Sequence, residues 1–138
     1  MHNRRSFLRL ASLAGAAIGT SSCQAGQANE TNISSQPIMI STWAHGEQAN
    51  EVGWPIIIAS GTALDAVEAG AAIVESDPKG TSVGLGGLPD REGIVTLDAC
   101  IMNHKNECGA VAYLQDIEHP ISVARRVMEK TDHVMLVG

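Results

Sequence analysis

The chain has 138 residues, enough for one domain, and it is 44% hydrophobic but only 3% aromatic. A core would therefore be built from Val, Ile, Leu and Ala. Beyond residue 29, six Lys and Arg residues stand against fifteen Asp and Glu residues. This acidic balance argues against nucleic-acid binding, which needs a basic surface, and its ordinary consequence is solubility.

Residues 1–23 have the anatomy of an export signal. The pair Arg4-Arg5 precedes Phe7, a weakly apolar stretch runs from residue 10 to 18, and small residues follow. The paired arginines resemble a twin-arginine signal, which predicts export to the periplasm of a bacterial envelope. The apolar stretch is too short to span a bilayer, which takes about 20 residues.

The segment Thr20-Ser-Ser-Cys23 resembles a bacterial lipoprotein box, although Thr20 stands where an aliphatic residue is usual. Two alternatives stay open. In one, Cys23 becomes a lipidated N-terminus that anchors the protein to a membrane; in the other, the site is an ordinary cleavage site with a bystander cysteine. Residues 24–36 are polar and predict a flexible tether under either alternative.

From residue 37 the pattern predicts alternating strands and helices. Residues 37–43 suit a first strand, and residues 44–53 a weak helix that Gly53 and Pro55 interrupt. Thr62 opens a clear helix, because Thr62-Ala-Leu-Asp65 resembles a capping box and small apolar residues then recur at helical spacing.

A glycine-rich loop, Thr81 to Asp90, follows that helix and predicts tight turns. Residues 94–102 and 108–114 are apolar runs around a polar turn, which predicts a hairpin. Residues 119–130 form the next helix, with Pro120 in its first turn. Residues 133–138 predict a buried strand. We expect protein beyond Gly138 to cover its apolar edge. The order predicts layered α+β structure rather than a doubly wound sheet.

Three other constellations have weaker chemical interpretations. Gly84-Leu-Gly86-Gly87 lacks the ending of a phosphate-binding P-loop, so a structural turn is the better interpretation. Ser82, His104 and Asp98 could supply a triad, but no nucleophile elbow is present; Asp65 and Asp98 are better explained as structural.

The third constellation is the cysteines. Cys100, His104, Cys108 and His119 are metal-ligand types at a spacing that matches no common zinc pattern, so we predict no metal site. Cys100 is predicted to be a small core residue, and a disulfide between Cys100 and Cys108 is the alternative.

Six blocks in order carry a family resemblance. They are Ser41-Thr-Trp43, Ala63-Leu-Asp-Ala-Val-Glu-Ala-Gly70, Ser82-Val-Gly-Leu-Gly-Gly-Leu-Pro-Asp90, Thr96-Leu-Asp-Ala99, Gly109-Ala-Val-Ala112, and His119-Pro-Ile-Ser-Val-Ala-Arg-Arg-Val-Met128 with His133-Val-Met-Leu-Val-Gly138. Residues 37–138 thereby resemble the N-terminal, α-subunit part of the glycosylasparaginases, the N4-(β-N-acetylglucosaminyl)-L-asparaginases.

The resemblance implies an N-terminal-nucleophile hydrolase with a four-layer αββα sandwich, of which residues 37–138 would form an incomplete half. Such a precursor cleaves itself before a threonine, whose hydroxyl then attacks the substrate amide while its free α-amine acts as the base. No cofactor is implied. The implied substrate is asparagine-linked N-acetylglucosamine, from which aspartate is released; some relatives cleave isoaspartyl peptides. Paired αβ units are the implied assembly.

The resemblance also implies roles for two residues. Trp43 matches a tryptophan that lines the substrate site, and Ser82 matches a serine that supports the active centre; the alternatives are a strand-end cover and a turn residue. The catalytic threonine and the oxyanion hole belong to the β-subunit, outside this sequence. We therefore expect a partial gene product, inactive without a β-subunit. The alternatives are a non-catalytic exported pseudo-subunit, an isoaspartyl peptidase or L-asparaginase relative, and a metal-binding exported module.

Overall fold

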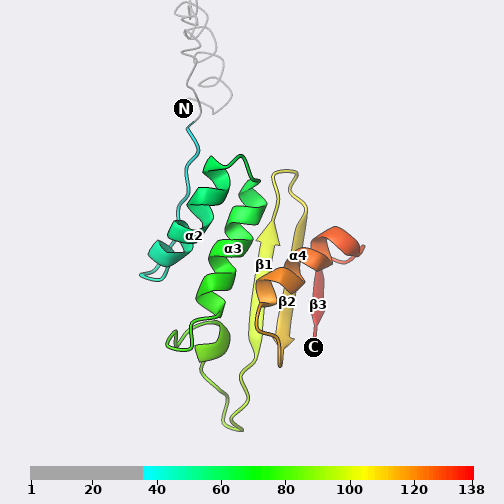
Figure 1. Ribbon diagram of the computed structural model, residues 1–138. Helices are drawn as coiled ribbons and strands as arrows, with labels where there is room; N and C mark the ends of the chain where they lie inside the picture. The colour runs from blue at the N-terminus through cyan, green and yellow to red at the C-terminus, as the bar shows by residue number, and fades with distance from the viewer. Residues whose placement is uncertain (1–35) are drawn as a thin grey trace, which may run out of the picture. The chain divides into compact units, whose positions relative to one another are not determined.

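A computed structural model describes residues 36–138, of which 37–138 form one unit (Figure 1). Its elements are α2 (Gly46–Ile58), α3 (Ala63–Glu75), a 3-10 turn (Gly84–Gly86), β1 (Leu97–Met102), β2 (Cys108–Leu114), α4 (Pro120–Lys130) and β3 (Met135–Val137). The predicted export signal, Cys23 and all but the end of the predicted tether lie outside the described residues. Within residues 36–138, none of the helices has the length and apolarity needed to cross a membrane.

Helix α3 begins as its sequence predicts. The Thr62 hydroxyl accepts a hydrogen bond from the Asp65 N–H at 3.1 Å, and the Asp65 carboxylate accepts one from the Thr62 N–H at 3.4 Å. The two bonds satisfy N–H groups that a helix N-terminus otherwise leaves unpaired. The predicted capping box is confirmed, and it sets the register of the helix that builds one wall of the site.

Helix α2 corrects the prediction for residues 44–59. A single helix runs through Gly53 and Pro55, which were expected to interrupt it. The reason is packing, because α2 and α3 lie side by side with their backbones close together (Figure 1). A Cβ on Gly53 would lie 2.7 Å from the Ala66 carbonyl oxygen, and one on Gly70 would lie 2.8 Å from the Ala49 carbonyl oxygen. Burial between the helices offsets the hydrogen bond that Pro55 removes.

The three strands form one sheet in the order β1-β2-β3. The β1–β2 pair is the predicted hairpin, antiparallel, with Cys100 opposite Ala110 and Met102 opposite Cys108. A bulge interrupts the register between Leu97 and Ala99, where the Asp98 carboxylate accepts a hydrogen bond from the Tyr113 N–H at 2.8 Å. Strand β1 starts three residues later than predicted, and β2 has the predicted bounds. Strand β3 runs parallel to β2 after the α4 crossover.

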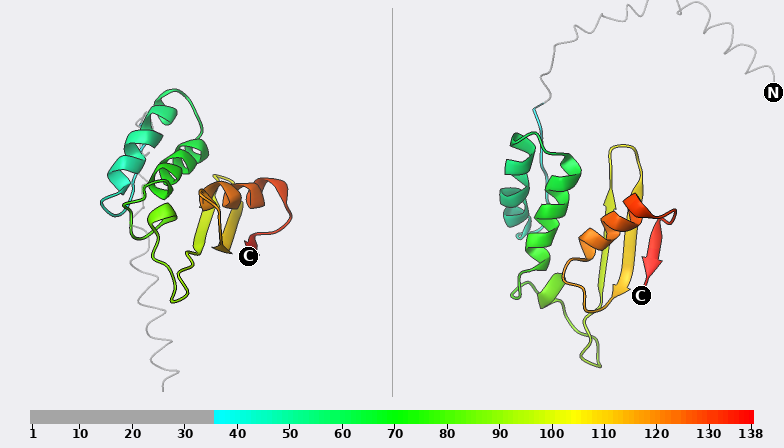
Figure 2. Two further views of the ribbon diagram at one scale, coloured as in Figure 1. Left: turned by 60° about the horizontal axis from the view of Figure 1, so that its bottom comes forward. Right: turned by 45° about the vertical axis from the view of Figure 1, so that its right-hand side comes forward.

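Helix α4 covers one face of this sheet (Figure 2). The core lies between them and consists of Ile101, Val111, Leu114, Ile121, Ala124 and Val127, each less than a tenth exposed. Gly109 allows the close approach, because a Cβ there would collide with the backbone of α4. This helix-on-sheet arrangement confirms the predicted α+β class and supplies two of the layers of a four-layer sandwich.

Strand β3 forms where residues 133–138 predict it, but the described residues leave it exposed. Met135, Leu136 and Val137 are 52%, 42% and 69% exposed. Because Ala110 pairs with Met135 and Ala112 with Val137, these four side chains share the sheet face opposite α4. None of the residues that the structure describes covers that face, which we call the open sheet face.

The predicted first strand at residues 37–43 is also wrong within residues 36–138. The segment has no strand partner, and Ile38 and Ile40 are 78% and 85% exposed. Met39 alone turns inward, and its methyl end reaches the space beside Gly53. A short apolar run forms a strand only where a neighbouring strand offers backbone hydrogen bonds.

Candidate functional site

A groove of about 760 Å³ runs between the helix pair and the sheet. Its walls come from residues 38–46, helices α2 and α3, the glycine-rich loop at Ser82 to Gly84, residues 96–98 at the start of β1, and Pro120 at the start of α4. The α3 wall is apolar, since Ala63, Val67 and Val74 line it. Strand β1 is an edge strand, and its first residues, Leu97 and Asp98, line the same groove.

Ser82 lies in the wall of this groove. The loop that carries it is held by Gly84, which has a φ of 62° and lies so close to the backbone of Glu75 that a Cβ would collide with it. A left-handed φ and a missing side chain are both properties of glycine. Gly84 therefore fixes the loop against the end of α3, and the place of Ser82 in the groove lining is consistent with the predicted supporting role, which stays a prediction.

Trp43 lies beside the groove rather than in its lining. Its side chain is 84% exposed and its backbone has a φ of 67°, although its neighbours Thr42 and His45 both line the groove. A left-handed conformation costs about 1–2 kcal/mol for a residue with a Cβ. An exposed tryptophan held in a costly conformation at the mouth of a groove favours a binding role over a packing role. The substrate contact itself stays a prediction.

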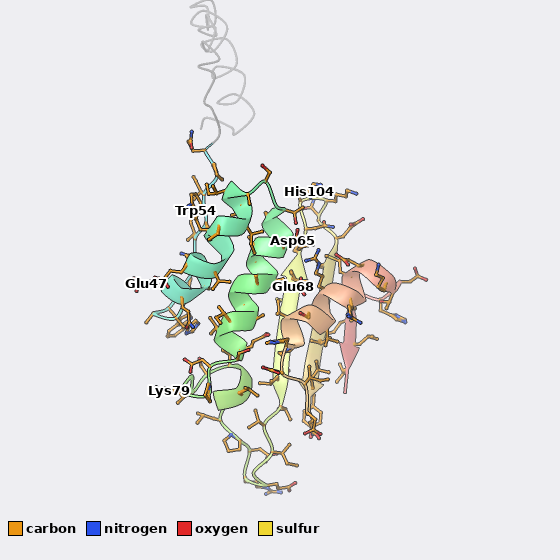
Figure 3. All side chains as sticks on the ribbon, viewed as in Figure 1. Glu47, Trp54, Asp65, Glu68, Lys79 and His104 are labelled. Atoms are coloured by element: carbon orange, nitrogen blue, oxygen red, sulfur yellow. The ribbon has the colours of Figure 1, made fainter. Side chains whose placement is uncertain are left out.

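The triad considered from the sequence is not assembled. Ser82 and Asp98 line the groove, but Figure 3 shows His104 at the tip of the turn between β1 and β2. The Asp98 carboxylate is already used by the Tyr113 N–H. Asp65 and Asp98 therefore have the structural roles that their surroundings predict.

The cysteines also differ from expectation. Cys100 is exposed on the open sheet face, so its predicted place in the core is wrong. Cys100 and Cys108 are both free, and the strand register offsets them, so the alternative of a disulfide across the hairpin is wrong as well. Among residues 36–138, no cluster of three His, Cys, Asp or Glu side chains could hold a metal ion.

A buried acidic joint beside the groove was missed by the sequence interpretation. Glu75 is 7% exposed, and its Oε1 accepts a hydrogen bond from the Ile121 N–H at 3.1 Å, while its Oε2 lies 3.5 Å from His119 Nδ1. Burial raises the pKa of the Glu75 carboxyl above its usual value, and the Ile121 hydrogen bond opposes that shift. Glu68 and Glu75 are seven residues apart on α3, so they lie on the same face of the helix. This spacing is the signal in the sequence that could have placed both side chains on the face toward α4.

A second cluster joins α3 to α4. The Arg125 guanidinium donates to Asp65 at 2.7 Å, to Glu68 at 2.6 Å and to Glu129 at 2.8 Å. Glu68 also accepts a hydrogen bond from the Ser122 hydroxyl at 2.6 Å; Figure 3 shows Asp65 and Glu68 on successive turns of α3. The Thr62 hydroxyl and Arg125 together hold the pKa of Asp65 below its usual range. Each of these three carboxylates is paired with Arg125, so the cluster fixes the angle between α3 and α4. None of the three is left unpaired to act as an acid or a base.

Comparison with known proteins gives a consistent result. The asparaginase family model matches residues 23–138. The chain is 49% identical over 140 residues to the N(4)-(beta-N-acetylglucosaminyl)-L-asparaginase of Elizabethkingia miricola, an alignment that covers 99% of the chain and 41% of that protein. It is 45% identical to the rat protein of the same name, over 74% of the chain and 30% of that protein. It is 47% identical to the plant-type L-asparaginase of Pyrococcus horikoshii, over 67% of the chain and 30% of that protein. The chain thus spans less than half the length of each of these relatives.

Proposed function

Because the chain belongs to the asparaginase family, which includes the glycosylasparaginases, we propose that it is the α-subunit part of an exported amide hydrolase. The substrate class would be asparagine-linked N-acetylglucosamine, with aspartate as a product. The observation that carries the proposal is the 49% identity along 99% of the chain to a glycosylasparaginase. The N-terminal-nucleophile chemistry that the resemblance implies then defines what a β-subunit would supply.

The groove supports the binding part of this proposal, because Ser82 is exposed in its lining and the Asp98 carboxylate there already accepts the Tyr113 N–H. The catalytic groups would come from outside the described residues. In the proposal, a β-subunit contributes the threonine, its free α-amine and the oxyanion hole. The α-subunit contributes the groove wall, with Trp43 at its mouth and Ser82 inside it. Paired αβ units would form the assembly.

The test is reconstitution of the two parts. The 138-residue chain would be assayed alone and after co-refolding with the complementary segment of the Elizabethkingia relative, using asparagine-linked N-acetylglucosamine and measuring free aspartate. We expect no release from the chain alone and release from the pair. Release by the chain alone would contradict the need for a β-subunit. A stable pair that releases nothing would favour the alternative of a non-catalytic pseudo-subunit.

The same assay tests the two assigned residues. In the active pair, Trp43→Ala is expected to lower kcat/KM by roughly tenfold or more, because an aromatic contact to substrate is lost. Trp54→Ala is the matched control, since Trp54 lies on α2 and does not line the groove. Ser82→Ala is compared with Thr81→Ala, an exposed neighbour outside the lining. If Trp43→Ala and Trp54→Ala lower kcat/KM equally, Trp43 has no specific role at the substrate site. If Ser82→Ala and Thr81→Ala lower it equally, Ser82 has no supporting role.

A second substrate class has its own support. The Pyrococcus relative is a plant-type L-asparaginase at 47% identity, so asparagine is the alternative substrate, and isoaspartyl peptides are the third. The reconstituted pair would be assayed on all three compounds. The glycosylated compound should give the highest kcat/KM; a higher value for either of the others would reassign the substrate.

We also propose that residues 1–23 direct export by the twin-arginine route. The observation is Arg4-Arg5 ahead of a weakly apolar stretch. Arg4→Lys with Arg5→Lys should retain a fused reporter in the cytoplasm, while Arg9→Lys should not. Labelling with a radioactive fatty acid separates the two interpretations of Cys23: incorporation that Cys23→Ser abolishes indicates a lipid anchor, and its absence indicates ordinary cleavage.

A further inference from the structure

The start of α4 is held by a side chain from another helix. His119 precedes the helix and makes no side-chain cap, and Pro120 has no N–H. The Ile121 N–H instead donates to Oε1 of Glu75, the last residue of α3, at 3.1 Å. A carboxylate is favourable at this position because a helix N-terminus carries unpaired N–H groups and partial positive charge. One oxygen of Glu75 is thus accounted for.

The other oxygen faces an imidazole. Glu75 Oε2 and His119 Nδ1 are both buried without a hydrogen-bond partner, and they lie 3.5 Å apart. Two lone pairs facing each other at this distance in a buried site would be costly, whereas a hydrogen on either atom makes the contact favourable. The buried pair therefore needs a proton between its two atoms.

Other charged groups nearby decide how that proton is held. On the exposed side, Glu118 Oε1 lies 3.8 Å from His119 Nε2. On α3, Glu68 also faces α4, but Arg125 neutralises it at 2.6 Å. A protonated imidazole can donate to Glu75 through Nδ1 and to Glu118 through Nε2, while a neutral imidazole can donate to only one of them.

We propose that Glu75 and His119 share one proton and that this proton locks the joint between α3, α4 and the Ser82 loop. The loop belongs to the joint because Gly84 lies directly against the backbone of Glu75. Loss of the proton leaves the imidazole with one N–H for two carboxylates, so Nδ1 can face Oε2 with no hydrogen between them, and this repulsion displaces the Glu75 carboxylate from the Ile121 N–H. His119 and Glu75 are positioning residues in this account. The inference does not depend on the hydrolase proposal.

Burial supports the same account, since it raises the pKa of Glu75 and keeps a proton available to the pair at higher pH than an exposed glutamate would allow. The contact weakens when the imidazole carries a single N–H on Nε2, toward Glu118, because the Nδ1 lone pair then faces Glu75 Oε2 with no hydrogen between them.

The test is amide hydrogen exchange of the full 138-residue chain from about pH 5 to about pH 9, the range in which an imidazole changes charge. Rates are divided by those of an unstructured peptide, so that the pH dependence of the exchange chemistry cancels. Protection of the Ile121 amide should fall by about fivefold as the pH rises, the size expected when a helix cap is lost. Protection of residues 82–84 should fall with it. Constant protection at Ile121, or a fall there that the loop does not follow, would overturn the proposal.

Variants assign the effect to the pair. Glu75→Gln keeps the acceptor for Ile121 without the charge, so protection should remain and its pH dependence should disappear. His119→Asn should also remove the pH dependence. His45→Asn is the matched control, because His45 lines the groove away from the joint, and it should leave the fall unchanged. A fall that survives in Glu75→Gln, or one that survives in His119→Asn, would overturn the assignment to the pair.

Discussion

Arg125 shows how one residue fixes the angle between two helices. It lies on α4 and reaches two carboxylates of α3, Asp65 and Glu68, while Glu129 on its own helix holds the guanidinium from the other side. The Arg125 side chain is only 21% exposed, so these pairs are screened less by water than surface pairs are. Three carboxylates around one cation are stable only while that cation is present.

We expect Arg125→Ala to lower the free energy of unfolding by roughly 1–3 kcal/mol, between the values for exposed and buried ion pairs. The physical reason is that the carboxylates would repel one another after the cation is removed. Arg126→Ala is the control, because Arg126 is the exposed neighbour with no ion pair among the described residues. Urea unfolding of both variants gives the comparison, and equal midpoints would show that Arg125 does not join the helices.

Asp65 gives a stability effect with a defined pH direction. The Thr62 hydroxyl first, and Arg125 second, hold the pKa of this carboxyl below its unfolded value. A carboxyl with a lowered folded pKa stabilises the fold above its unfolded pKa, and that stabilisation disappears as the pH falls through the folded pKa.

Asp65→Asn should therefore be less stable than the original chain at neutral pH, and the difference should shrink as the pH falls below about 4. Melting temperatures across that range provide the measurement. Asp90→Asn is a useful comparison, because Asp90 caps only its own exposed turn through the N–H groups of Glu92 and Ile94. A difference between Asp65→Asn and the original chain that is the same at every pH would contradict the linkage.

At the scale of an element, the glycine-rich loop and the turn that follows it contain two kinds of glycine. Gly84 and Gly93 both have a left-handed backbone, with φ of 62° and 83°. A Cβ on Gly84 would collide with the backbone of Glu75, whereas a Cβ on Gly93 would meet nothing within 4 Å. An alanine at position 93 therefore tests the cost of the left-handed backbone alone, whereas an alanine at position 84 adds the cost of the steric collision with Glu75.

Gly93→Ala should cost about 1 kcal/mol of stability for the left-handed backbone alone. Gly84→Ala should cost about 3 kcal/mol or more, because the loop must also move away from α3. Thermal unfolding of the two variants measures the difference. In the reconstituted pair, Gly84→Ala should also reduce activity by displacing Ser82. Similar losses for the two variants would mean that the loop does not depend on the contact with Glu75.

The elements that the sequence predicts well are those with local signals. The capping box at Thr62, the proline in the first turn of α4 and the β2 strand are set by residues near one another in the chain. The errors involve distant partners. Residues 37–43 have a strand pattern without a neighbouring strand, and Pro55 is tolerated because α3 packs beside it. The Glu75–His119 contact joins residues 44 positions apart in the chain, a distance that no local pattern encodes.

At the scale of the whole described unit, only one face of the three-stranded sheet is covered by other residues. Helix α4 buries one face of the sheet, while the open sheet face exposes Met102, Met135 and Val137 at 61%, 52% and 69%. Both edge strands have unpaired backbone groups, and the groove beside β1 is apolar along α3. Contiguous apolar surface of this kind on a sheet with free edges mediates association in water. In the αββα sandwich that the resemblance implies, a second sheet would pack on this face.

The 138-residue chain alone is therefore expected to bind the dye ANS and to self-associate, and co-refolding with the complementary segment of a relative should suppress both.

Met135→Lys with Val137→Lys should reduce self-association of the isolated chain, because each lysine places a charge on the open sheet face. The same double substitution should also block co-refolding with the complementary segment. Ile58→Lys is the control, since Ile58 is similarly exposed, at 62%, but lies at the end of α2. Size-exclusion chromatography distinguishes the outcomes.

If Ile58→Lys reduces association as much as the double variant, general surface charge explains the effect. If the double variant still co-refolds into an active pair, the second sheet does not pack on this face, and the groove beside β1 becomes the place where the two halves meet.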